Sequence, residues 1–360
     1  MNSRMRVAAM LCRLAAAVCA AHFCILGPAR AEEALQPLSA ADFRMRVWRG
    51  FTLDELSAVT PENFSDMARF GARLVRVGLH LHRCADCDAY AIPSARLDTV
   101  DRALTLAEQH GLYVVLTLVP EKPQGAPYWM RRDLQDSIVA VWQELARRYR
   151  GRTAMAGFDL INEPKPPGSL QAQSDAFVQL AGRLIEGIRA VDPERMVIFE
   201  PAPSGNAHFG FKPLKAPLPY KNVLYSAHFY KPDEVTHQGV GGKASDEPYP
   251  GRRGDRDELQ RFVEPLRAFA RRHNVPVYVG EFSCVRWAPG DSAEQWTRDV
   301  LELFKTERWS WTFHAFRGWH GWDHELGPAD PKPGSVAEAT RMRRGDTAVM
   351  TMLREHMGRR

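Results

Sequence analysis

Eight short apolar runs that alternate with stretches of helical periodicity constrain the fold of this chain more than any other feature. Apolar runs of about four to eight residues bounded by Gly and Pro are typical of strands buried on both faces of a parallel sheet. The expected strands are residues 43–51, 72–79, 112–119, 155–161, 195–201, 222–230, 275–282 and 309–316. The expected helices are residues 61–70, 95–111, 134–151, 170–192, 257–274 and 293–306. This pattern predicts an α/β protein with a single (β/α)8 TIM barrel.

An open doubly wound sheet is the alternative architecture. No G-x-G-x-x-G motif follows the first expected strand and no G-x-x-x-x-G-K-[ST] motif occurs, so the nucleotide-binding forms of that fold lose support. Residues 203–221 are rich in Pro and Gly and are expected to form a long loop. Residues 231–257 and 323–346 are expected to form extended loops at the C-terminal face of the barrel strands.

Residues 1–31 have the features of a secretory signal peptide. Two arginines precede an apolar run that ends in a small-x-small cleavage pattern at 29–31. An uncleaved membrane anchor is the alternative, but Arg13 leaves the run short of the about 20 residues that span a bilayer. We therefore expect a secreted or periplasmic protein with one folded domain at residues 32–360 and no stable membrane anchor after cleavage.

The formal net charge of +5 gives little information about partners. Residues 1–31 carry four arginines and no acidic residue, so the remainder has 44 basic and 43 acidic residues. No basic stripe with interleaved aromatic residues is present, which argues against nucleic acid as a partner.

Three of the six cysteines lie outside the expected signal peptide. Cys84 and Cys87 have the spacing of half a zinc site, but no second pair completes four ligands. A local disulfide suits an exported protein better. Cys284 is then the unpaired thiol, and we expect it to be packed rather than reactive.

Polar residues collect at the ends of several expected strands. They are Arg76 on the second strand, Asn162 and Glu163 after the fourth, His228 and Tyr230 at the end of the sixth, and Glu281 at the end of the seventh. Barrel enzymes assemble their sites from the carboxyl ends of different strands. A structural ion pair is the ordinary explanation for any one of these residues, but the coincidence of six favours a site. Two carboxyl groups across a cleft are what glycosidic cleavage requires, because one protonates the leaving oxygen while the other attacks or activates water.

Four short motifs resemble the pattern of glycoside hydrolase family 5, the cellulase-like group of barrel glycosidases. They are the Arg in LVRVG at 74–78, INEP at 161–164, HFY at 228–230 and GEF at 280–282, and the similarity extends over roughly 43–325. The resemblance implies a retaining mechanism through a covalent glycosyl-enzyme. It also implies that Glu163 is the general acid/base and Glu281 the nucleophile. Arg76, His228 and Tyr230 would orient Glu281, and Asn162 would contact the sugar.

Two positions depart from the family pattern. The third strand usually ends in a His, and Val119 stands at that place here; His80 or His82 is the candidate substitute. The eighth strand usually ends in a Trp that floors the sugar site, and His314 stands near that place. Stacking aromatics are sought among Trp48, Trp129, Trp287, Trp311, Trp319 and Trp322, although each could equally be core. Trp319 and Trp322 are favoured because they share a Gly-rich loop with His320, Asp323, His324 and Glu325. Three of these, His320, Asp323 and His324, could ligate a metal, but no second cluster supports that reading.

The sequence therefore predicts an exported retaining β-glycosidase, endoglucanase-like or cellulase-like, that acts on a β-glucan-like polysaccharide or oligosaccharide. Glu163 and Glu281 are the expected catalytic pair, with carboxyl groups about 5–5.5 Å apart. The expected substrate contacts are His80, Trp311, Trp319 and Trp322, and no metal or cofactor is expected. The alternatives are a mannanase, an exo-β-glucosidase, an exopolysaccharide-processing hydrolase, or a catalytically silent carbohydrate-binding barrel.

Overall fold

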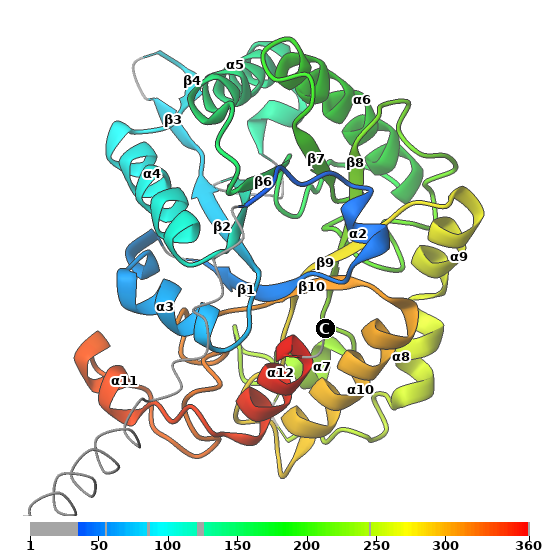
Figure 1. Cartoon of the computed structure of the whole chain (residues 1–360). Helices are drawn as coiled ribbons and strands as arrows, with labels where there is room; N and C mark the ends of the chain where they lie inside the picture. The colour runs from blue at the N-terminus through cyan, green and yellow to red at the C-terminus, as the bar shows by residue number, and fades with distance from the viewer. Residues whose placement is uncertain (1–34, 55, 85–86, 121–125, 245, 359–360) are drawn as a thin grey trace, which may run out of the picture. The chain divides into compact units, whose positions relative to one another are not determined.

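The predicted TIM barrel is confirmed by a computed structural model that describes residues 35–54, 56–84, 87–120, 126–244 and 246–358. Eight parallel strands close in the order β1-β10-β9-β8-β7-β6-β5-β2 (Figure 1). The strands are β1 (Arg49–Leu53), β2 (Leu74–His80), β5 (Tyr113–Val119), β6 (Met155–Asp159), β7 (Met196–Phe199), β8 (Val223–Phe229), β9 (Val277–Phe282) and β10 (Ser310–Phe313). A separate antiparallel pair, β3 (His82–Cys84) and β4 (Ala89–Ala91), follows β2.

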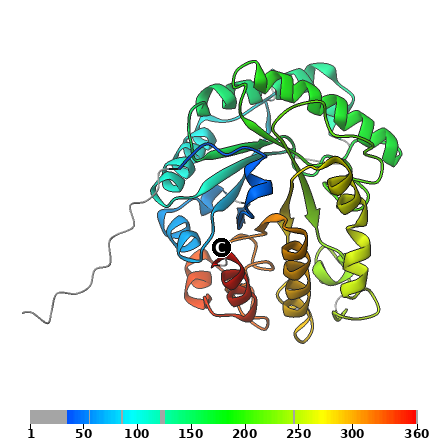
Figure 2. The ribbon, with the colours of Figure 1, turned by 45° about the vertical axis from the view of Figure 1, so that its right-hand side comes forward.

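Helices cover the strands, most of them as an outer ring (Figure 2). They are α2 (Asp42–Met45), α3 (Pro61–Arg69), α4 (Ser94–Gln109), α5 (Arg132–Tyr149), α6 (Leu170–Arg189), α7 (Asp233–Thr236), α8 (Arg256–Phe262), α9 (Glu264–His273), α10 (Ser292–Glu307), α11 (Val336–Met342) and α12 (Ala348–Gly358). Two 3-10 turns, Leu56–Ala58 and Pro127–Trp129, complete the regular structure. Within the described ranges, no helix is long and apolar enough to cross a membrane.

Side-chain alternation along the strands divides the apolar core into two clusters. Val75 and Val77 of β2 face the larger cluster that the helices share, whereas Leu74 belongs to a smaller cluster of strand residues and α2. On β8, Leu224 belongs to the same small cluster and Tyr225 to the large one. Because successive side chains point to opposite faces of a strand, the inward positions after Leu74 and Leu224 bring Arg76 and His228 towards the C-terminal end of the barrel.

Several element boundaries differ from the predicted ones. The strand expected from residue 43 begins at Arg49, because α2 occupies Asp42–Met45 and packs Phe43 edge-on against Tyr278 inside the barrel at 6.2 Å between ring centroids. The helix expected at 257–274 is divided between α8 and α9, and Pro265 lies in the first turn of the second part. This division fits a residue that cannot donate its backbone N–H within a helix.

The C-terminal segment is more regular than predicted. Residues 323–346 were expected to be loop, but α11 lies within them, and α12 follows and packs against α10 (Figure 2). Ser335 accepts a hydrogen bond from the Glu338 N–H at 3.1 Å, and Gly334 donates its N–H to the Glu338 carboxylate at 2.6 Å. The Ser-x-x-Glu spacing of a capping box was therefore a local signal for the start of α11. The loop expected at 203–221 is confirmed.

The cysteines behave as the sequence indicates. Cys84 and Cys87 are joined in a disulfide. Cys284 is a free, buried thiol whose pKa is raised by burial, which fits a packed rather than a reactive side chain. The expected signal peptide at residues 1–31 lies outside the described residues.

Candidate active site

A cavity of about 560 Å³ opens at the carboxyl ends of the barrel strands. It is lined by Thr52, Leu53, Asp54, Arg76, Gly78, His80, Thr117, Val119, Asn162, Glu163, Ser204, Asn206, His228, Tyr230, Lys231, Asp233, His237, Phe262, Glu281, His314 and Trp322. All six polar residues that the sequence placed at strand ends are in this set. Barrel closure thus brings together positions that are far apart in the chain.

Glu281 lies at the end of β9 and is held by two donors. Arg76 donates from Nη1 to Glu281 Oε1 at 2.6 Å, and the Tyr230 hydroxyl donates to Oε2 at 2.9 Å. Burial alone would raise the pKa of Glu281, but the positive charges nearby, with the hydrogen bond from Tyr230, hold it below the ordinary value of 4.5. Burial and the charge of Glu281 raise the pKa of Tyr230 well above 10, so that its hydroxyl stays a donor. The Glu281 carboxylate is therefore fixed in its ionised form.

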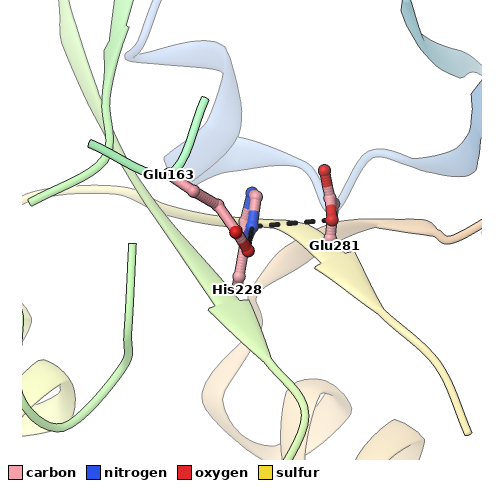
Figure 3. A group of neighbouring side chains, drawn as sticks. All are labelled: Glu163, His228 and Glu281. Carbon is pink, nitrogen blue, oxygen red and sulfur yellow. Dashed lines mark hydrogen bonds and ion pairs between the residues drawn. The ribbon is translucent and has the colours of Figure 1, made fainter. Parts of the chain in front are cut away.

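Glu163 follows β6 and lines the same cavity as Glu281. Its backbone has a φ of 47°, in the left-handed region that non-glycine residues rarely adopt. Its side chain is 36% exposed, and Oε1 lies 2.9 Å from His228 Nδ1. Figure 3 shows His228 beside both carboxylates, with Nδ1 3.6 Å from Glu281 Oε2. One oxygen of Glu163 and one of Glu281 lie within 4.8 Å of each other.

Arg76 is the centre of a buried network beneath these two carboxylates. Only 1% of this residue is exposed. Its Nη2 donates to Glu200 Oε1 at 2.7 Å and to Asn162 Oδ1 at 2.8 Å, and its Nε donates to Asp159 Oδ2 at 3.0 Å. Because the Asn162 carbonyl oxygen accepts from Arg76, the amide nitrogen of Asn162 is the group that can donate to a ligand in the cavity.

Three acidic residues of this region were not among those predicted from the sequence. Asp159 and Glu200 are fully buried below the cavity, and Asp54 lines it at the end of β1. Glu200 closes the apolar run RMVIFEP, the same strand-end position that drew attention to Glu163 and Glu281. The sequence therefore carries a strand-end signal for Glu200, but none of the four family motifs includes this residue.

Glu163, His228 and Glu281 also have the mutual distances of a possible metal site. Their chemistry fits a hydrogen-bonded group better, because Arg76 and Tyr230 already engage both oxygens of Glu281. His320, Asp323 and His324, the other metal candidates, do not form such a group within the part of the chain that the structure describes. Asp323 pairs with Arg343 at 2.8 Å, and burial lowers the pKa of His324 to about 4 while its Nε2 lies 2.8 Å from the Cys284 carbonyl oxygen.

The family model for cellulases, glycosyl hydrolase family 5, matches residues 40–320 of this chain. The chain belongs to glycosyl hydrolase family 5. A β-xylosidase from Phanerodontia chrysosporium is 27% identical over 252 residues, which cover 62% of this chain and 49% of that protein. Endoglucanase H from Acetivibrio thermocellus is 25% identical over 58% of this chain and 21% of its own length. This chain thus spans about half of the first relative and about a fifth of the second.

Solved structures of the family share the fold. Thermotoga maritima Cel5A in complex with cellobiose superposes with a TM-score of 0.69 at 21% sequence identity, over 87% of this chain and 99% of that chain. Agreement at this level of identity concerns the barrel and not the substrate.

The two departures from the family 5 pattern both lie in the cavity wall. Val119 lines it from the end of β5, and His80 lines it from the neighbouring β2. His82 lies on β3, outside the lining residues. His314 lies at the end of β10 with Nδ1 3.2 Å from Asp54 Oδ1 and 3.5 Å from Glu281 Oε2. The place of the expected Trp is thus occupied by a group that can donate to carboxylates.

The candidate tryptophans have different environments. Trp322 lines the cavity, with its ring centroid 4.8 Å from that of His314 and 6.0 Å from that of Tyr230. Trp319 packs against Trp322 at 5.0 Å between ring centroids and is not among the described residues that line the cavity, so its sugar contact stays a prediction.

The prediction of Trp311 as a sugar platform is wrong. This residue is 2% exposed and packs edge-on against Phe282 in the cluster shared with the helices. Its neighbour Thr312 faces inwards, where it contacts Tyr278 of the smaller cluster. Alternation along β10 therefore sends Trp311 outwards. Of the other candidates, Trp48 is buried in the smaller cluster, and Trp129 and Trp287 pack partly buried against the larger one.

Proposed function

We propose that this chain is a retaining β-glycosidase that hydrolyses β-linked glucan-like polysaccharides or oligosaccharides. The observation that carries the proposal is the carboxylate pair, Glu163 and Glu281, with oxygens within 4.8 Å at the floor of an open cavity. Retaining enzymes hold their carboxyl groups about 5–5.5 Å apart, whereas inverting enzymes need about 6.5–9.5 Å to place a water between sugar and base. The short separation favours direct attack by a carboxylate.

The environments of the two acids support different roles. Glu281 is buried, ionised and oriented by Arg76 and Tyr230, as a nucleophile should be. In the first step Glu281 attacks the anomeric carbon, the glycosidic C–O bond breaks, and the leaving oxygen takes the proton of Glu163. In the second step Glu163 takes a proton from water, which attacks the anomeric carbon and releases Glu281. The side chain of Glu163 is 36% exposed, so water can reach it for the second step.

The proposed substrate class rests on the cavity wall and on family membership. Trp322 offers an aromatic face, and Asn162 and His80 offer polar groups, as sites for sugar rings need. One relative is named endoglucanase H, which supports a glucan substrate, and another is named β-xylosidase, which supports a β-linked sugar. We also propose export of the chain, which rests on residues 1–31 alone.

A substrate panel with active-site variants tests the function. Purified protein should release sugars from β-glucans, and Glu281→Gln should abolish turnover while thermal unfolding stays near wild type. The matched control is Glu144→Gln, which removes an exposed carboxylate on α5 and should leave the rate unchanged. A 2-deoxy-2-fluoro glycoside should label Glu281, as seen by mass spectrometry of peptides. Lack of labelling and turnover with every sugar would indicate a silent binding barrel, and turnover of mannans instead would reassign the substrate.

A further inference from the structure

Glu200 contacts residues of the active site but has no role in the mechanism proposed above. It follows β7, is 1% exposed and does not line the cavity. Its Oε2 accepts a hydrogen bond from the Glu163 backbone N–H at 3.1 Å, and its Oε1 accepts from Arg76 at 2.7 Å and lies 3.1 Å from His228 Nε2. One buried carboxylate therefore contacts two of the side chains that bind Glu163 and Glu281, and it also accepts a hydrogen bond from the backbone of Glu163.

The two side chains that contact Glu200 also contact Glu163 or Glu281. Arg76 donates a hydrogen bond from its other terminal nitrogen, Nη1, to Glu281 Oε1 at 2.6 Å. His228 Nδ1 lies 2.9 Å from Glu163 and 3.6 Å from Glu281. Glu200 thus occupies the side of the His228 ring opposite to the catalytic pair, where a carboxylate determines whether Nε2 carries a proton.

The charges around His228 favour its protonated form. The ionisable groups that act on it or lie in contact with its partners are Glu163, Glu200, Glu281, Arg76, Asp159, Tyr230 and His314. Burial would lower the pKa of His228, but Glu200 and Glu281 outweigh burial and raise it well above 6.5. Burial likewise opposes ionisation of Glu200, but the charges of His228 and Arg76 lower its pKa to about 2. Burial, with the charge of Glu200, raises the pKa of Asp159 well above 3.8, so that this second acid is neutral.

We propose that Glu200 is a positioning residue that keeps His228 doubly protonated, so that one fixed positive charge lies between Glu163 and Glu281 throughout the reaction. The inference rests on the proposed retaining function. In the first step negative charge leaves Glu281, which bonds to the sugar, and appears on Glu163, which has given its proton to the leaving oxygen. The Nδ1–H of His228 is close to both carboxylates and balances that charge in either position.

The Glu200→Gln variant tests this role because it keeps the size of the side chain and removes its charge. We expect kcat on an aryl β-glycoside to fall by about 10²-fold with little change in KM, since Glu200 does not line the cavity. We also expect the alkaline limb of the pH profile to move down by about 1–3 pH units, because His228 then loses its proton more easily. Glu200→Asp, which keeps the charge, should retain the wild-type limb.

The matched control is Asp192→Asn. Asp192 is 8% exposed and pairs with Arg195 at 3.1 Å between α6 and β7, so its loss removes a buried, arginine-paired carboxylate away from the cavity. This variant should be less stable but keep the wild-type pH profile. A Glu200→Gln enzyme with wild-type kcat and pH profile overturns the inference. A wild-type protein without any glycosidase activity overturns the proposed function instead.

Nitrogen NMR of the wild-type imidazole rings measures the protonation state of His228 directly, and a variant serves only to assign its signal. Both nitrogens of His228 should carry protons up to pH 8, with the signal assigned by its loss in His228→Asn. A neutral His228 ring at pH 7 overturns the inference.

Discussion

Replacement of Arg76 by Met isolates the charge that stabilises the buried acids. Arg76 is 1% exposed and contacts three acidic side chains, at 2.9 Å to the neutral Asp159, 2.7 Å to the ionised Glu200 and 2.6 Å to the ionised Glu281. Met preserves most of the side-chain volume and removes the positive charge. Loss of one partner from a buried ion pair costs about 3–5 kcal/mol, because the remaining charge has no compensation.

The pKa of Glu200 supports the same magnitude. The pKa is lowered from 4.5 to about 2, against the effect of burial, by His228 and Arg76. At 1.36 kcal/mol per pKa unit, this shift corresponds to roughly 3 kcal/mol of stability at neutral pH, shared between the two cations. A group with a depressed pKa in the folded state contributes stability above its unfolded pKa, and the contribution is lost as pH falls through the folded value. The difference between wild type and Arg76→Met should therefore be full at pH 7 and shrink below about pH 4.5.

Urea unfolding followed by tryptophan fluorescence at pH 7 and pH 3 measures this difference. Arg286→Met is the matched control, because Arg286 is 2% exposed but donates to the backbone carbonyl oxygens of His320 and Gly327. The control should lose similar stability at both pH values. Equal losses for Arg76→Met at pH 3 and pH 7, or a loss below about 1 kcal/mol at pH 7, would refute the reasoning. In assays, the acid limb of kcat/KM should move to higher pH, because Glu281 must be ionised to attack.

The remaining predictions concern the cavity wall and the support of Glu200. Trp322→Ala should raise KM for oligosaccharides about tenfold, equivalent to ~1.4 kcal/mol, with little change in the free energy of unfolding. Trp311→Ala should instead lower the free energy of unfolding by about 3–5 kcal/mol. The opposite pattern would contradict the placement of Trp322 in the cavity wall and of Trp311 in the core. Gly205 and Gly241 both have a φ of 59°, but a Cβ on Gly205 would lie 2.9 Å from Glu200 Oε2 whereas nothing lies within 4 Å of one on Gly241. Each Ala variant should lose about 1–2 kcal/mol from backbone strain, as measured by thermal unfolding, and Gly205→Ala alone should lose activity; equal activity in both would show that the position of Glu200 is unimportant.

The barrel and the meeting of Glu163 and Glu281 at its rim could be predicted because both depend on local patterns. Apolar runs mark strands, helical periodicity marks the connections, and eight repeats of this unit leave few architectures. Glu163 and Glu281 stand directly after or at the end of such runs, so parallel packing alone brings them to the same rim. Short local signals also sufficed for the Cys84–Cys87 disulfide and for the loop at 203–221.

Only the tertiary structure decided which side chains face the barrel interior. Strands buried on both faces are apolar throughout, so their sequence lacks the alternation that would distinguish inside from outside. For this reason the sequence predicts Trp311 for the cavity although its side chain faces the helices. Glu200 has the strand-end signal in the sequence, but only the fold places it beneath Glu163 and Glu281. The chain sequence determined that two acids would meet at the rim. The register of the closed barrel determined that Arg76, His228 and Glu200 would meet beneath them, because the inward direction at each strand end depends on how all eight strands pair.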